Sequence, residues 1–127
     1  MADLNRQRGR ATGYTGFFGN LNTIEGQLQL IDAILADEKA MAGGVLVQQA
    51  IGVVLGDAVA QAKGLSWYML DANIGRGPCL GLPGTTLKLL PVMAFADAIV
   101  RGDKPSARDL FDLFCRRFED LKAQLPR

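Results

Sequence analysis

The chain has 127 residues, a length typical of one domain, and such a domain buries roughly two thirds of the surface that its unfolded chain exposes. Hydrophobic residues make up 49% and charged residues 21%, which excludes an intrinsically disordered chain. With a net charge of +1, the protein as a whole is not attracted electrostatically to nucleic acid or to a membrane surface. The sequence has no histidine, which excludes Ser-His and Cys-His catalytic pairs and every histidine metal ligand.

The two cysteines, Cys79 and Cys115, are too far apart in the sequence for a metal knuckle or a redox pair, so we expect two buried thiols, no metal and no cofactor. The stretch Met1–Arg10 is polar and has no apolar region of a signal peptide, so we expect a cytoplasmic protein.

Gly44–Ala62 carries one formal charge, at Asp57. Its glutamines, glycines and alanines favour a buried central helix over a transmembrane one.

In chain order, residues 1–20 come first, and their four glycines predict an irregular N-terminal arm. We expect the three arginines of this arm to be solvated, because no stacking aromatic pattern typical of nucleic-acid binding accompanies them. They are Arg6, Arg8 and Arg10. The remaining residues, 21–127, are predicted to form a single α+β domain.

The first helix is predicted to begin with Asn22 as its cap and Glu25 as the capping partner, and to end around Asp37 to Lys39. Its apolar residues recur at helical spacing: Ile24, Leu28, Ile31 and Leu35.

The second helix is predicted over Gly44 to Lys63, with Gly64 as its left-handed stop. Gly52, Gly56 and Ala60 form a ridge of small residues at spacing four on this helix. Each glycine inside a helix costs about 1 kcal/mol relative to alanine. We therefore expect another backbone to cross the ridge closely, and the alternative is a groove that faces a ligand.

The next region predicts a small antiparallel sheet of three short strands. The expected strands are Leu65–Leu70, Cys79–Leu82 and Thr85–Leu90, with a turn cluster over Asp71–Pro78. Two helices are predicted to follow, one over Val92–Arg101 and a last one capped by Ser106. The predicted fold class is therefore α+β: helices plus a small three-stranded antiparallel sheet, followed by two helices.

The candidate binding residues are Asp57, Trp67, Asp71, Asn73 and Arg76. A carboxylate and a guanidinium near one turn can grip a polar ligand, but Asp and Asn also stabilise turns through their own backbone. Asp57 is either a carboxylate with a pKa raised by desolvation, or one that pairs with Arg76 or Lys88 or reaches solvent. We favour pairing or solvent contact. No residue is assigned a catalytic role.

Several short motifs occur in a recognisable order: Ala50–Ala58, Gly64–Trp67, Asp71, Gly75–Arg76, Leu90–Met93 and Arg101–Gly102. In that order they resemble the bacterial family called domain of unknown function 3806, over about Gln49 to Gly102. The resemblance implies a small α+β domain with no established activity and no catalytic residues to transfer.

The expected function is a non-enzymatic interaction module that binds a protein partner or a second copy of itself, in an immunity-like or adaptor-like role. The alternative is a small-molecule-binding protein or a modest enzyme with an Asp/Arg pocket beside Trp67. The alternative requires the candidate side chains to converge on a concave site. The interaction module requires an exposed apolar patch or a large interface, with no nucleic acid and no membrane as partner.

Overall fold

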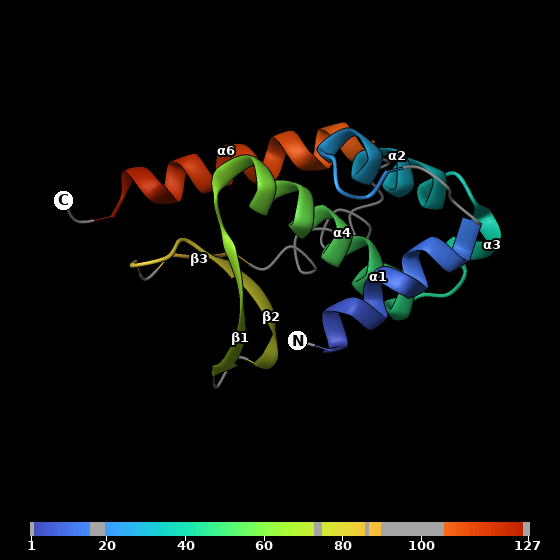
Figure 1. Ribbon diagram of the computed structural model, residues 1–127, viewed down its shortest axis with the longest axis horizontal. Coiled ribbons are helices and arrows are strands. Elements are labelled where there is room, and N and C mark those ends of the chain that lie inside the picture. Colours follow the sequence, from blue (N-terminus) through green and yellow to red (C-terminus); the bar gives the residue numbers. More distant parts are fainter. Residues whose placement is uncertain (1, 16–19, 73–74, 86, 90–105, 126–127) are drawn as a thin grey trace.

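The computed structural model describes residues 2–15, 20–72, 75–85, 87–89 and 106–125, and these belong to the α+β class, as predicted. The elements run in the order α1 (Ala2–Thr15), α2 (Ile24–Leu35), α3 (Glu38–Met41), α4 (Val45–Lys63), β1 (Ser66–Ala72), β2 (Gly75–Gly81), β3 (Lys88–Leu89) and α6 (Ala107–Ala123). In Figure 1, α4 runs through the middle of the molecule, α6 crosses above it, and the β1–β2 hairpin extends away below.

Helix α4 forms the centre of the core and packs against α1, α2 and α6. Its buried residues lie around most of its circumference rather than on one stripe, which confirms the prediction of a central helix: Val47, Ala50, Ile51, Val53, Val54, Leu55, Ala58 and Val59. No helix of the described residues is long and apolar enough to span a bilayer. Gly64 ends α4 in the left-handed conformation, at φ 68° and ψ 35°, as predicted.

The ridge of small residues on α4 faces the interior of the protein: Gly52 and Gly56 are buried, and Ala60 is partly buried. Burial agrees with both a backbone crossing and a groove that faces a ligand, so the crossing stays a prediction.

The N-terminal arm is not irregular: the prediction is wrong for Ala2–Thr15, which forms α1. Leu4, Gln7 and Ala11 follow at helical spacing and are buried where α1 packs on the rest of the molecule. Burial of this face outweighs the low helix propensity of the glycines in the segment, since tertiary packing supplies most helix stability in proteins. The number of glycines in the segment does not reveal this stabilisation by tertiary packing.

Helix α2 begins one residue later than predicted. Thr23, not Asn22, is the cap, and its side-chain oxygen accepts a hydrogen bond from the backbone N–H of Gly26 at 3.1 Å. The chain before the cap passes so close to Gly26 that a β-carbon there would collide with the backbone oxygen of Asn20. Glycine is therefore required where the entering loop folds back over the first turn of α2. Asp37 caps the short helix α3.

The strands of the sheet have different bounds than predicted. β1 and β2 pair antiparallel, with Trp67 opposite Leu80 and Asp71 opposite Arg76. The predicted turn cluster over Asp71–Pro78 is wrong for most of its residues, because pairing between the two strands satisfies their backbone groups and overrides local turn preference.

The third strand is also shorter than predicted. Of the described residues in the predicted strand Thr85–Leu90, only Lys88 and Leu89 of β3 pair with β2, opposite Gly81 and Leu80. The helix predicted over Val92–Arg101 lies outside the described residues.

The last helix confirms its prediction. Ser106 and Asp109 form a reciprocal capping box, in which each side chain accepts a hydrogen bond from the other residue's backbone N–H. One face of α6 is buried through Leu110, Phe114 and Phe118.

Replacing Ser106 by alanine should destabilise the protein by about 1 kcal/mol, because the N–H of Asp109 loses its acceptor at the end of α6. Urea unfolding followed by circular dichroism measures the change. Ser106→Asp keeps a capping oxygen and should restore most of the loss. An equal loss in both variants would contradict the capping role.

Candidate functional site

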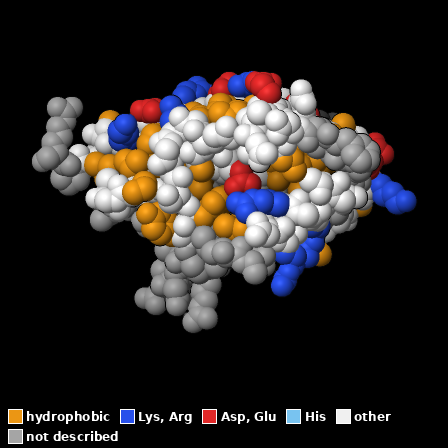
Figure 2. All heavy atoms as spheres, in the orientation of Figure 1, with side chains coloured by type: hydrophobic (Ala, Val, Ile, Leu, Met, Phe, Trp, Pro, Cys, Tyr) orange, Lys and Arg blue, Asp and Glu red, His pale blue; other side chains and the backbone are white. Residues whose placement is uncertain are grey.

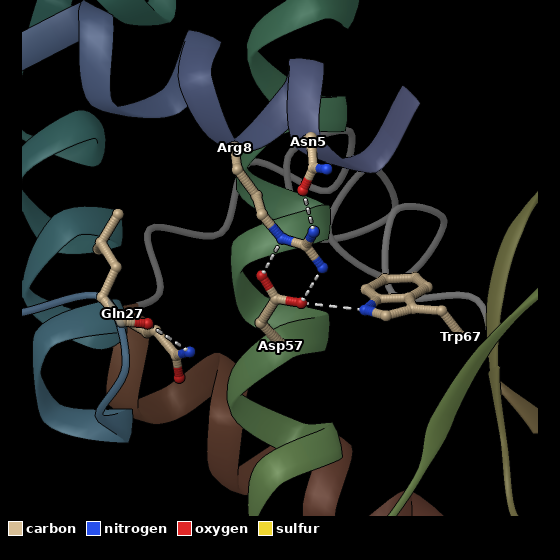
Figure 3. A network of polar contacts seen from close by, with 6 residues as sticks. Asn5, Arg8, Gln27, Asp57 and Trp67 are labelled. Atoms are coloured by element: carbon tan, nitrogen blue, oxygen red, sulfur yellow. Dashed lines mark hydrogen bonds and ion pairs between the residues drawn. The ribbon is translucent and has the colours of Figure 1, made fainter. Parts of the chain in front are cut away.

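The most developed polar network in the described residues joins α1, α4 and β1 around Asp57 (Figure 3). The guanidinium of Arg8 donates from Nε to Asp57 Oδ2 and from Nη2 to Asp57 Oδ1, both at 2.7 Å. The indole Nε1 of Trp67 donates to Asp57 Oδ1 at 2.9 Å. Arg8 Nη1 donates to Asn5 Oδ1 at 2.8 Å, so the arginine is also held within its own helix.

Each residue of the network is positioned by the helix or strand that carries it. Asp57 is the one formal charge on α4 before Lys63, and it lies on the side of the helix that meets α1. Arg8 follows the buried Gln7 on α1, whose Nε2 donates to Gln49 of α4 at 3.4 Å. These two links lie two turns apart along α4 and fix the position of α1 on it.

The Arg8–Asp57 pair is only partly solvated, with side-chain exposures of 34% and 19%. The hydrogen bond to Asp57 raises the pKa of Arg8 above its ordinary value, and this effect outweighs the opposing desolvation. Figure 2 shows an acidic and a basic group in contact near the middle of one face, with hydrophobic side chains around them. The bidentate geometry is the strong form of an arginine–carboxylate pair.

A cavity of about 430 Å³ adjoins this pair. Its lining combines two charged, three amide and two apolar side chains: Arg8, Asp57, Asn22, Gln27, Gln61, Leu21 and Val54. Gln27 is 6% exposed, and its Nε2 donates to the backbone oxygen of Leu21 at 3.0 Å. Its Oε1 is buried without a hydrogen-bond partner among the described residues.

Two of the five candidate residues meet directly, Asp57 and Trp67. Asp57 pairs with Arg8, and its expected pairing with Arg76 or Lys88 stays a prediction, because the side chains of those two residues lie outside the described part of the structure. Asp71 and Arg76 face each other in the register of the hairpin, and Asn73 lies outside the described residues. Whether those three residues bind a ligand stays a prediction.

Sequence reasoning missed Arg8 and Gln27. Arg8 was assigned to a solvated arm because its helix was not predicted, although Leu4 and Ala11 lie on one helical face and place Arg8 at its edge. Gln27 lies within the apolar face of α2, between Ile24 and Leu28. A glutamine in such a position signals either a buried hydrogen bond or a ligand contact.

The network is built to hold a carboxylate in place. Asp57 accepts three N–H bonds, so both of its oxygens are engaged by fixed donors. The described residues contain no group of three or more His, Cys, Asp or Glu side chains that could hold a metal ion. The arrangement therefore offers recognition of polar groups, with Arg8 as a charged donor and the amides of Gln27 and Gln61 at the cavity wall.

The cysteines lie apart from this network. Cys79 is buried, as expected, whereas Cys115 is partly exposed, so the prediction of two buried thiols is half right. Desolvation raises the pKa of Cys115 above its ordinary value, and the nearby Lys63 opposes this only in part.

We expect iodoacetamide to alkylate Cys115 more slowly than an unstructured peptide thiol at neutral pH, because the thiolate is the reacting form. Mass spectrometry of the folded protein against a matching peptide measures the two rates. The rate should continue to rise with pH beyond the range in which the peptide rate levels off. Equal rates and equal pH profiles would contradict this expectation.

Comparisons with known proteins place the chain by sequence alone. Neither the search of curated proteins nor the search of solved structures found a match. The family described as Domain of unknown function (DUF3806) matches residues 27–111, which include Gln27, Asp57 and Trp67 but leave out α1 and Arg8. This match covers more than half of the chain and extends the resemblance seen in the sequence motifs at both ends, so the chain belongs to the DUF3806 family.

Proposed function

We propose that this protein is a non-enzymatic binding module that holds a small polar ligand in the cavity beside the Arg8–Asp57 pair. One observation carries the proposal: the cavity lies against a partly buried ion pair and is also lined by the side-chain amides of Asn22, Gln27 and Gln61. Amide groups both donate and accept hydrogen bonds, so they suit a small polar ligand.

Two features favour binding over catalysis. Asp57 is held by three donors, so it is poorly placed to accept a proton from a substrate. Among the described residues that line the cavity, no cysteine, serine, threonine, lysine or tyrosine is present to act as a nucleophile. The cavity volume is large enough for a small molecule, in the range of about 300–1,000 Å³ that binding sites and active sites share.

The proposal is tested by screening a library of small metabolites against the ¹⁵N-labelled protein. Trp67 is the single tryptophan of the chain and donates to Asp57, so its indole N–H signal reports directly on the site. We expect a subset of compounds to shift this signal in the native protein and to bind at least tenfold more weakly to Asp57→Asn. A library with no compound that shifts the signal would overturn the proposal.

A protein-interaction module is the second candidate, supported by exposed apolar side chains. Leu46 is 52% exposed at the start of α4, and Leu113 is 40% exposed on α6. Leu113 lines a shallow depression of about 380 Å³ together with Arg116, Arg117, Asp120 and Leu121. Sedimentation equilibrium over a hundredfold concentration range tests self-association. A monomer throughout, with unchanged behaviour of Leu113→Ser, would count against association through this face.

We also propose a cytoplasmic location. The support for it is that the chain has two cysteines, whereas small secreted domains are typically rich in disulfides.

A further inference from the structure

We infer that α1 is a detachable helix: it leaves α4 as a unit while the other described helices stay folded, and its departure uncovers the Asp57 carboxylate. Opening of this kind is a property of the free protein, so it is measured without a ligand and is independent of the proposed binding function. Three features of α1 support it: a small apolar contact, a composition that weakens the helix, and polar contacts that water reaches.

The apolar contact of α1 with the core is small. Of the described residues that form the main hydrophobic cluster, α1 supplies Ala11, whereas α6 supplies five, three of them phenylalanines. Leu4 is buried as well, but outside this cluster. Hydrophobic stabilisation is roughly proportional to the apolar area removed from water. Separating α1 from the core is therefore much less costly than unfolding α4 or α6, and the cluster stays nearly complete.

The glycines of α1 weaken the helix without a packing reason. A β-carbon built on Gly9 or Gly13 would meet no atom of the described structure within 4 Å, so neither glycine serves a close approach of another segment. Each glycine lowers the helix equilibrium about fivefold relative to alanine. The 14 residues of α1 do not form a stable helix alone, since even alanine-rich peptides of about 12–15 residues are marginal in water. Leaving α4 and unfolding of α1 are therefore one transition.

The polar contacts described between α1 and α4 are accessible to water in part. In the Arg8–Asp57 pair the two side chains are 34% and 19% exposed, so water replaces some of the stabilisation that opening removes. The contact from Gln7 Nε2 to Gln49 Oε1 is long, at 3.4 Å. Asp57 Oδ1 keeps a donor when α1 leaves, because Trp67 belongs to β1 (Figure 3). The open form thus presents a carboxylate with one oxygen held and the other released.

The experiment is native-state hydrogen exchange of the full chain, followed by NMR. We expect the interior amides of α1, Arg8 to Thr12, to share one opening equilibrium, with protection lower than in α4 and α6 by a factor of about a hundred or more. Their exchange should respond weakly to urea below the unfolding transition, because this opening exposes little surface. Equal protection and equal urea dependence in α1 and α4 would overturn the inference, since α1 would then open only when the whole molecule unfolds.

Two substitutions separate the release of α1 from global unfolding. Gly9→Ala strengthens the helix at an exposed position and should raise the protection of all interior α1 amides about fivefold. Phe114→Leu weakens the core outside α1 and should lower protection in α4 and α6 about fivefold, with no change in α1. Gln29→Ala, at an exposed position of α2, is the control and should leave α1 unchanged. A fall of α1 together with α4 in Phe114→Leu would rule out a separate opening.

The ion pair is tested with matched substitutions of two arginines in α1. Arg8→Gln removes the guanidinium bound to Asp57 and should lower the protection of α1 about fivefold. Arg10→Gln makes the same change at an arginine that donates to Gln7 of its own helix, and should alter protection by less than about twofold. Equal effects would contradict the role of Arg8 in holding α1. An effect of Gly9→Ala confined to neighbouring amides would show fraying from one end and would overturn release as a unit.

Discussion

Replacing Phe114 by alanine is expected to lower the free energy of unfolding by about 3–4 kcal/mol, the range for a large aromatic side chain removed from a well-packed core. Phe114 is 2% exposed on the inner face of α6, where this helix packs on α4 and α2. Truncation removes the burial of the ring and leaves a cavity that the surrounding helices fill only in part. Urea unfolding followed by tryptophan fluorescence and circular dichroism measures the loss.

Leu113→Ala is the matched control for this substitution. Leu113 is the preceding residue of α6 and is 40% exposed, so its truncation should cost less than about 1 kcal/mol. A loss for Phe114→Ala similar to that for Leu113→Ala would mean that α6 is not an integral part of the core. The assignment of the buried face of α6 would then be wrong.

Replacing Asp57 by alanine is expected to cost about 2 kcal/mol, the second largest effect. The change removes the acceptor of three N–H groups and leaves the Nε1 of Trp67 without its partner. Charge-assisted hydrogen bonds are worth about 1.5–3 kcal/mol each when buried, but Arg8 is about one third exposed and regains water, which reduces the total. Thermal and urea unfolding both measure the effect.

A double-mutant cycle separates the ion pair from the other contacts of Asp57. Arg8→Ala alone should cost about 1 kcal/mol, and the double variant should be less destabilised than the sum of the two single changes, by about 1 kcal/mol. Asp112→Ala, at an exposed position of α6, is the control and should change stability by less than about 0.5 kcal/mol. Additive losses for Arg8 and Asp57 would contradict a direct coupling between α1 and α4.

The same cycle bears on how α1 relates to the site. Residues 27–111 carry the family match, so Asp57 and Trp67 lie inside it, whereas Arg8 lies outside it. In this protein, a helix beyond the matched region neutralises the carboxylate at the edge of the cavity. The charge of the site is therefore set by a tertiary contact that involves residues outside the family pattern.

The sequence alone was sufficient to predict the helices that have strong hydrophobic periodicity and clear capping residues at their ends. Helix α4 was recognisable from its apolar run and its stop at Gly64, and α6 from the cap at Ser106 and the face through Phe114. In these segments the local signals and the packing agree, so nothing in the tertiary structure overrides them. The family was recognisable for the same reason, because its short motifs lie in order along one stretch of chain.

Where local preference and long-range contact disagree, only the tertiary structure decided. Glycine-rich residues at the N-terminus form α1 because Leu4 and Ala11 find a core to pack on, and the residues around Arg76 form a strand because β1 pairs with them. The partner of Asp57 could not be read from spacing, since Arg8 is 49 positions away in the sequence. A lone charge on an apolar helix indicates that some partner exists, but the crossing of two helices determines which arginine reaches it.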